Sequence, residues 1–201
     1  MTKNVVLIDY GVGNIRSVIR VLESCKTSTQ DDAKVEITDS LEKISSADLI
    51  ILPGVGAFNA ASSQLEPFAD LIRGKVTNEG TPLIGICLGM QLLFEKSEEG
   101  EGSGLGIFSG SVTKLNSKRV PHMGWNTIDY SNSSGPAWAY FAHSFACRPE
   151  DRSIVSGQTT YDGDTFPSVM RTQNILATQF HPEKSDLSGI GLIKDFISEV
   201  L

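Results

Sequence analysis

The sequence is poor in cysteine and histidine and has no long apolar run. Only three cysteines (Cys25, Cys87 and Cys147) and three histidines occur in 201 residues, without C-x-x-C or H-x-x-x-H spacing. This argues against a disulfide framework and a zinc site, so we expect a reduced, cytoplasmic protein without a metal. No stretch approaches the about 20 apolar residues of a membrane span, and no signal peptide precedes the first strand-like run.

A basic surface is also missing. The net charge is −7, with 17 Lys and Arg against 24 Asp and Glu, and the densest basic cluster is the pair Lys118-Arg119. Proteins that bind nucleic acid usually present a basic face to the phosphates, so we expect no such partner. The hydrophobic content of 40% and the length are typical of one globular domain, 1–201.

The first half alternates short apolar runs with segments of helical period. The predicted strands are Val5–Ile8, Asp48–Leu52 and Pro82–Ile86. The predicted helices are Asn14–Cys25, Pro67–Asn78 and Leu88–Lys96. Continuous apolar strands separated by helices are typical of a parallel sheet that is covered on both faces.

The second half changes to short strand-like segments separated by turn residues. Glu98–Gly106 is rich in glycine and glutamate and predicts a solvated loop. The strand candidates that follow are Gly110–Leu115, Trp125–Tyr130, Ala139–Ala142, Ser153–Ser156, Ser168–Arg171 and Ile175–Phe180. An amphipathic helix, Leu187–Leu201, closes the chain. We therefore predict an α/β fold: a three-layer sandwich with a central, mostly parallel sheet and an antiparallel extension.

The most informative motif is a cysteine between two glycines. Gly85, Cys87 and Gly89 form G-x-C-x-G between a predicted strand and a predicted helix. This is the thiol form of the nucleophile elbow, in which a tight turn exposes the nucleophile above a sheet. We expect the glycines to be required because a Cβ would clash in the turn. The following helix N-terminus favours a thiolate, and the N–H of Leu88 is a candidate donor to an oxyanion.

A candidate base lies about a hundred residues downstream, in His181-Pro182-Glu183. Residues two apart in an extended segment face the same side, so Glu183 can orient the imidazole of His181, and Pro182 favours that geometry. Such a tripeptide alone fits a solvated turn, but together with the thiol elbow it indicates a Cys–His–Glu triad. His143 is the alternative base, and we expect His122 to be structural or at an interface.

The two motifs closely resemble those of class I, triad-type glutamine amidotransferases. Three further segments resemble the glutaminase subunits of imidazole glycerol phosphate synthases: Asp9–Ser17, Pro121–Asn126 and Tyr140–Ser144. The resemblance implies that Cys87 attacks the carboxamide of L-glutamine and that His181 protonates the leaving ammonia. Water then hydrolyses the glutamyl thioester, and no cofactor is implied.

The same resemblance implies further site residues. Gly54 and Val55 match the loop that completes the oxyanion hole with Leu88. The positions that match glutamine-binding residues are Gln91, Glu95, His143, Ser144 and Phe145. Many relatives carry tyrosine where Phe145 stands, so a backbone contact would survive there and a phenolic hydrogen bond would not.

The resemblance also implies a partner, a (β/α)8-barrel cyclase subunit that receives the ammonia in a heterodimer. The cyclase makes imidazole glycerol phosphate, for histidine biosynthesis, and aminoimidazole carboxamide ribotide. The positions that match the partner face are Asn14, Met123, Trp125 and Lys184. Met123 and Trp125 fit an ordinary core equally well. Because the oxyanion loop carries two glycines, we expect it to rest inactive without the partner, which would make the isolated chain a poor glutaminase.

Other interpretations share part of this evidence. An amidotransferase serving pyridoxal phosphate, anthranilate or purine synthesis would keep the triad, but Pro121–Asn126 argues against it. A cysteine peptidase or deglycase would hydrolyse its substrate without a synthase, and a non-catalytic module would not need Cys87. Gly11-Val12-Gly13 is not a dinucleotide loop, because Arg16 stands where the third glycine is needed.

Overall fold

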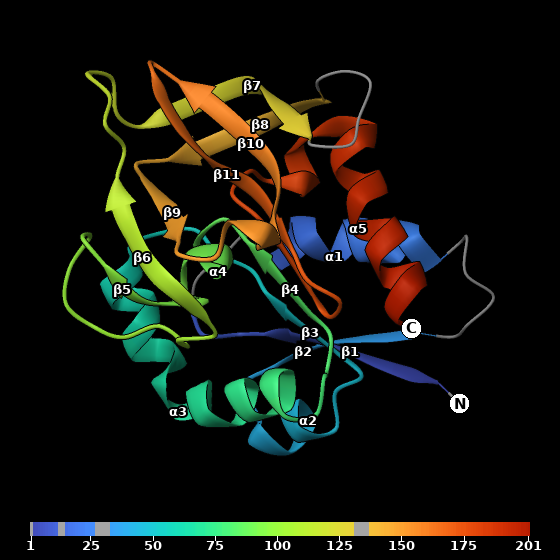
Figure 1. Ribbon diagram of the computed structural model, residues 1–201. Coiled ribbons are helices and arrows are strands. Elements are labelled where there is room, and N and C mark those ends of the chain that lie inside the picture. Colours follow the sequence, from blue (N-terminus) through green and yellow to red (C-terminus); the bar gives the residue numbers. More distant parts are fainter. Residues whose placement is uncertain (1, 12–14, 27–32, 131–136) are drawn as a thin grey trace.

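A nine-stranded mixed sheet forms the centre of the molecule (Figure 1). The computed structural model describes residues 2–11, 15–26, 33–130 and 137–201. In spatial order the strands are β2 (Ala33–Thr38), β1 (Lys3–Ile8), β3 (Leu49–Leu52), β4 (Leu83–Ile86), β12 (Ile175–Thr178), β11 (Asp164–Arg171), β10 (Val155–Tyr161), β7 (His122–Tyr130) and β8 (Ala137–His143). The first five are parallel and the rest antiparallel, which confirms the predicted α/β class.

Helices cover both faces of the parallel part. Strands β3, β4 and β12 are buried along their whole length, which requires cover on both sides. Along β1, Val6 and Ile8 pack with α2 (Leu41–Ser45) and α3 (Phe58–Thr77), whereas Val5 and Leu7 pack with α1 (Ile15–Lys26) and α5 (Asp186–Val200). Side chains that alternate along β1 therefore pack into two separate hydrophobic layers, one on each face of the sheet.

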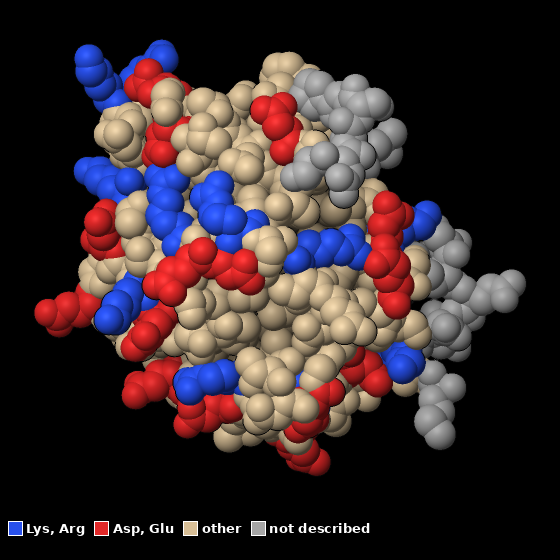
Figure 2. All heavy atoms as spheres, in the orientation of Figure 1, with Lys and Arg blue, Asp and Glu red and all other residues tan. Residues whose placement is uncertain are grey.

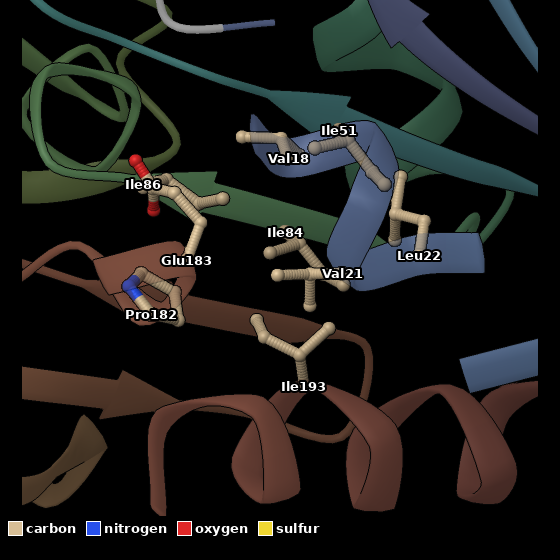
Figure 3. A pocket seen from close by; sticks show the side chains of 9 residues that line it. All are labelled: Val18, Val21, Leu22, Ile51, Ile84, Ile86, Pro182, Glu183 and Ile193. Atoms are coloured by element: carbon tan, nitrogen blue, oxygen red, sulfur yellow. The ribbon is translucent and has the colours of Figure 1, made fainter. Parts of the chain in front are cut away.

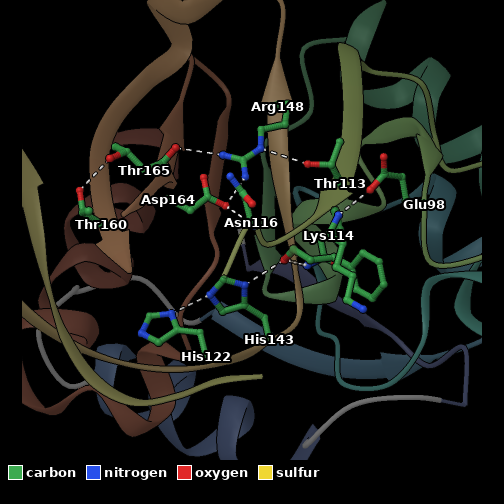
Figure 4. A network of polar contacts seen from close by, with 12 residues as sticks. Glu98, Thr113, Lys114, Asn116, His122, His143, Arg148, Thr160, Asp164 and Thr165 are labelled. Carbon is green, nitrogen blue, oxygen red and sulfur yellow. Dashed lines mark hydrogen bonds and ion pairs between the residues drawn. The ribbon is translucent and has the colours of Figure 1, made fainter. Parts of the chain in front are cut away.

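A second sheet of three strands lies beside the first: β5 (Phe94–Ser97), β6 (Phe108–Lys114) and β9 (Phe145–Pro149). Arg148 on β9 joins the two sheets (Figure 4). Its guanidinium lies 2.6 Å from the carboxylate of Asp164 and donates to the carbonyl oxygen of Thr165, both on β11. It also donates to the hydroxyl of Thr113 on β6. This junction holds β9, and the cavity beside it, against the main sheet.

One predicted helix is wrong. Instead of Leu88–Lys96, α4 is a single turn, Leu88–Gln91, and β5 starts three residues later. The apolar run Leu92 to Phe94 is buried on every side, and such a run fits a helical period without forming a helix. The carbonyls of Leu92 and Leu93 accept from the N–H groups of Leu105 and Ile107, so they pair with a returning segment instead.

Other boundaries shifted because tertiary contacts outweigh local signals. Helix α3 begins at Phe58, so Pro67 lies inside it rather than at its start. Three elements were not predicted: the edge strand β2, in which apolar and polar residues alternate, the short α2, and β9. The first half of the predicted strand Ser153–Ser156 belongs to a 3-10 turn, η1 (Arg152–Ile154), and its second half begins β10, which continues to Tyr161.

Candidate active site

Cys87 occupies the elbow between β4 and α4. Its backbone has φ 53° and ψ −103°, a left-handed conformation that costs a non-glycine residue about 1–3 kcal/mol. The turn is held by the N–H of Cys87, which donates to Thr178 of β12 at 2.7 Å, and by the N–H of Gln91, which donates back to Cys87. The strain therefore sits on the cysteine itself and fixes where the sulfur points.

The glycines of the elbow are required by close packing rather than by a positive φ. A Cβ on Gly89 would lie 2.0 Å from the carbonyl oxygen of Leu52, and one on Gly85 would lie 2.9 Å from Gly89. Gly54 is equally confined, since its Cβ would meet that of Leu88 at 2.5 Å. The loop after β3 thus packs directly on the elbow.

A buried tyrosine fixes the start of that loop. The hydroxyl of Tyr10 donates a hydrogen bond to the carbonyl oxygen of Pro53. Burial and the nearby Cys87 raise the pKa of Tyr10, so the phenol keeps its proton and remains a donor. Beyond this anchor Val55 is exposed and Gly56 adopts φ 112°. The loop is therefore held at its first residue and open at its tip.

His181 and Glu183 form a buried pair beside the thiol. Their side chains are each 2% exposed, with His181 Nδ1 2.9 Å from Glu183 Oε1. The turn η2 (Pro182–Lys184) brings the carboxylate back, rather than the expected extended segment. Burial alone would lower the pKa of His181, but hydrogen bonds to Cys87 and Glu183, and their negative charge, raise it to about 10. The imidazole is therefore a cation at neutral pH.

The second carboxylate oxygen of Glu183 is isolated. Oε2 is buried and has no hydrogen-bond partner among the described residues. The side chain of Glu183 also borders a cavity of about 10 Å³ whose other lining residues are apolar (Figure 3). The lining side chains come from α1, β3, β4, η2 and α5: Val18, Val21, Leu22, Ile51, Ile84, Ile86, Pro182 and Ile193. Among the described residues the one ion pair of Glu183 is with His181, so the buried carboxylate depends on that partner.

A cavity of about 180 Å³ opens in front of the thiol. It is smaller than the about 300–1,000 Å³ of pockets for drug-sized ligands, which favours a small substrate. Its lining residues are Val55, Gly56, Cys87, Leu88, Gln91, Glu99, Ala142, His143, Ser144, Phe145, His181 and Lys184. The structure thus brings together most of the predicted catalytic, oxyanion and substrate-binding positions, with Gly54 buried just behind Leu88.

Glu95 is an exception among the predicted residues. It is exposed on β5 and does not line the cavity. Glu99 lines it instead, and its Oε2 accepts from the N–H of Phe58 at the start of α3 at 2.8 Å. Sequence reasoning missed Glu99 because four glutamates lie between positions 95 and 101, and composition does not tell which one turns inward.

The other two histidines form a neutral pair (Figure 4). His143 Nδ1 donates to the carbonyl oxygen of Phe145 at 2.9 Å, so its Nε2 must accept from His122 Nδ1 at 3.1 Å. Burial lowers the pKa of His143 to about 3 and that of His122 to about 4. Among the described residues no carboxylate hydrogen-bonds to His143, and its acceptor nitrogen is already occupied, which argues against it as the base. His122 stacks between Phe141 and Tyr161, a structural position.

An apolar face is exposed next to the cavity. Met123 and Trp125 on β7 are 66% and 52% exposed, so a core role for them is wrong. Met123 pairs with Ala142, which lines the cavity, and Trp125 pairs with Tyr140. Lys184 Nζ lies 5.5 Å from the centre of the Tyr140 ring. We call Met123, Trp125 and Tyr140 the hairpin face; Asn14 lies outside the described residues.

On the face seen in Figure 2, acidic and basic side chains are interspersed. Among the described residues no cluster of histidine, cysteine, aspartate and glutamate has the arrangement of a metal site. None of the described helices is long and apolar enough to cross a membrane.

Known proteins match this chain over nearly its whole length. Residues 6–199 match the family described as Glutamine amidotransferase class-I. The imidazole glycerol phosphate synthase subunit HisH of Methanocaldococcus jannaschii is 42% identical over 200 residues, covering 95% of this chain and 97% of that protein. The HisH subunit of Pyrococcus furiosus is 40% identical, covering 96% and 97%.

Solved structures share the fold. A crystal structure of a glutamine amidotransferase superposes with a TM-score of 0.75 at 21% identity, covering 97% of this chain and 98% of that one. The crystal structure of a glutamine amidotransferase from Methylobacillus flagellatus gives a TM-score of 0.61 at 13% identity, covering 90% of this chain and 70% of that one. At such identities the likeness concerns architecture alone.

Proposed function

This chain belongs to the class I glutamine amidotransferase family, and we propose that it hydrolyses L-glutamine to glutamate and ammonia through a thioester on Cys87. We further propose that one domain, 1–201, does so in the cytoplasm. The observation that carries the proposal is the meeting of Cys87 with the His181–Glu183 pair at the wall of one small cavity. A nucleophile, a base and its orienting carboxylate in this order are the requirements of acyl transfer.

The proposed reaction starts from a thiolate and an imidazolium. The sulfur of Cys87 attacks the carboxamide carbon, and the oxyanion accepts hydrogen bonds from the N–H of Leu88 and from the Gly54–Val55 loop. His181 gives its proton to the departing nitrogen, which leaves as ammonia. His181, now neutral, takes a proton from water, which attacks the thioester and releases glutamate and the thiolate. Glu183 orients the imidazole and stabilises its positive charge in each step.

The polar wall of the cavity supports glutamine as substrate. Gln91 donates its Nε2 to the carbonyl oxygen of Phe145 at 2.9 Å, so its Oε1 is left to accept from the substrate carboxamide. The carboxylate of Glu99 suits the α-amino group, and Ser144 offers a hydroxyl. Glu95 is too exposed for that role, and we assign the ammonium contact to Glu99.

A labelling experiment tests the reaction. A chloroketone analogue of glutamine should alkylate Cys87 alone, with glutamine protecting it, and Cys87→Ala should lower glutaminase turnover by about 10⁴-fold or more. Cys147→Ala is the matched control, because Cys147 is buried in the core. If the protein were a cysteine peptidase or deglycase, the chloroketone would not alkylate Cys87 and the protein would hydrolyse other substrates.

We also propose that the hairpin face and Lys184 bind a (β/α)8-barrel cyclase, which takes the ammonia for imidazole glycerol phosphate synthesis in the histidine pathway. The support is that exposed apolar side chains start at the rim of the cavity, where a partner would exclude water. The curated relatives are named as subunits of that synthase. The product ammonia would then leave the cavity without meeting solvent.

Serine substitutions test the docking proposal. Met123→Ser with Trp125→Ser should weaken binding of the cyclase by at least about tenfold, since central apolar residues carry most interface energy. Leu41→Ser is the control. Leu41 is also an exposed apolar residue, at 50%, but it lies on α2, far from β7 (Figure 1). Equal affinities of the two variants would contradict this interface. Adding the cyclase should also raise glutaminase turnover. Full turnover by the isolated chain would refute the proposal that the oxyanion loop at Gly54 and Val55 is inactive without the partner.

A further inference from the structure

Gln179 is a fully buried glutamine next to the nucleophile that sequence reasoning did not single out. It directly follows β12 and is 0% exposed, and its backbone N–H donates to Ser168 of β11 at 3.0 Å. Its side chain points toward the elbow. Its Nε2 lies 3.7 Å from Cys87 Sγ, and its Oε1 lies 3.3 Å from Gln91 Nε2.

The surrounding contacts fix which way the Gln179 amide faces. The carbonyl oxygen of Phe145 is an acceptor only, and it receives hydrogen bonds from both Gln91 Nε2 and His143 Nδ1. Gln91 therefore presents its NH₂ group on this side. The amide atom of Gln179 that faces this NH₂ must be its oxygen, which turns its own NH₂ toward the sulfur. A flipped amide would set two NH₂ groups against each other.

Given the proposed function, we propose that Gln179 stabilises the thiolate of Cys87 and holds it on the side of the cavity where substrate binds. A hydrogen bond to the charged form of an acid favours that form, and more strongly where water is excluded. The donor is neutral and keeps its proton throughout the cycle, so it does not compete with His181 as acid or base. The sulfur of Cys87 therefore has two donors: His181, which transfers a proton during the reaction, and Gln179, which does not.

The chain of contacts also links the nucleophile to the substrate wall. Gln91 lines the cavity and holds Oε1 of Gln179, which in turn holds the sulfur. The strained backbone of Cys87 leaves its side chain few alternatives, and the Gln179 contact selects among them. Gln91 thus acts on the thiolate through Gln179, separately from any contact it makes with glutamine.

The pH dependence of alkylation tests this role without any glutamine. Iodoacetamide reacts with thiolates, so its rate at Cys87, read by peptide mass spectrometry from pH 4 to 9, reports the thiolate fraction. In Gln179→Met, which keeps the size and loses the donor, the midpoint should move up by about one pH unit, about a tenfold lower rate below the midpoint. Gln179→Glu should move it further, because a carboxylate repels the thiolate.

Two further variants make the result decisive. Gln158→Met is the control, since Gln158 on β10 is a half-buried glutamine whose Oε1 accepts from Arg152. It should leave the midpoint in place. Gln179→Asn withdraws the amide by one methylene and should give a smaller upward shift, which keeps the test available if the methionine variant does not fold. A midpoint equal to that of the control in a folded Gln179 variant, with only thermal stability reduced, would assign Gln179 a packing role and overturn the proposal.

The outcome is separable from the proposed function. If Gln179 variants shift the midpoint but the complex with the cyclase hydrolyses no glutamine, the thiolate role stands and the glutaminase proposal fails. If the glutamine analogue labels Cys87 with unchanged pH dependence in the variants, the reverse holds. In the complex, Gln179→Met should lower kcat about tenfold and leave KM nearly unchanged, because the residue contacts the sulfur and not the substrate.

Discussion

The molecule holds two buried histidine sites, and they are shifted in opposite directions. His181 has a carboxylate at 2.9 Å and a thiol beside it, and its pKa rises to about 10. His143 has a carbonyl oxygen and a second histidine as partners, and burial lowers its pKa to about 3. Both rings are almost fully buried. Burial therefore sets the cost of a charge, and the partner decides whether the charge exists.

The comparison assigns the proton-transfer role to one site and a positioning role to the other. A cation at His181 has a proton to give to the leaving group, while the neutral His143 holds the Phe145 carbonyl that also receives Gln91. The carbonyl oxygen of Phe145 thus connects His143 to Gln91, a residue of the cavity wall.

The largest effect is expected when each histidine is replaced by asparagine in turn. His181→Asn should lower kcat of the cyclase-bound enzyme by about 10⁴-fold, because it removes the general acid and base. His143→Asn should cost about tenfold or less, since an asparagine NH₂ can still donate to Phe145. Glutaminase assays of both variants decide this. A larger loss in the His143 variant would make His143 the base.

The next effect isolates the carboxylate. Glu183→Gln removes the negative partner, so the pKa of His181 should fall toward its ordinary value and kcat should drop by about 10²-fold to 10⁴-fold. The pH profile of kcat should show the change as an alkaline limb displaced to lower pH. An unchanged profile would mean that Cys87 alone sets the charge of the imidazole.

A smaller effect is expected on stability in acid. The folded-state pKa values of His143 and His122 lie below the unfolded value of about 6.5. Their contribution is therefore complete above about pH 6.5 and is lost as the pH falls through 4 toward 3. Each histidine should add a slope of at most about 1.4 kcal/mol per pH unit to the free energy of unfolding. Urea unfolding from pH 7 to 4 should be flatter for the double variant His122→Asn/His143→Asn; an equal slope would contradict neutral burial.

The smallest effect is expected from the side chain of Phe145. Phe145 holds Gln91 and His143 through its backbone carbonyl, so Phe145→Tyr should change kcat/KM by no more than about threefold, within the range of neutral substitutions. Steady-state kinetics with glutamine measures it. A tenfold gain would show that the missing hydroxyl matters in this chain.

The parts of the site that were predicted are those encoded in contiguous residues. The elbow at Cys87 and the sequence His181-Pro182-Glu183 can each be identified from a motif of three to five consecutive residues. The mixed sheet followed from the change in apolar patterning between the two halves. Glycine spacing also foretold the tight packing at Gly85 and Gly89, although the positive φ fell on Cys87.

The parts that were missed depend on residues far apart in the chain. Gln179 contacts Cys87 across 92 positions and Gln91 across 88, and no local pattern marks such a buried amide. Glu99 is one of several glutamates in a loop, and only the fold turns it inward. The length of α4 differs from the prediction because a continuous apolar run is compatible with a helical period, and the segment that returns to pair with Leu92 and Leu93 lies farther along the chain.

Titration of the three histidines by NMR in ¹⁵N-histidine-labelled protein tests the central claim most directly. The account predicts that His181 is still an imidazolium at pH 8 and titrates near 10, while His122 and His143 remain neutral down to pH 5. A neutral His181 at pH 7, or a charged His143 at pH 6, would contradict it.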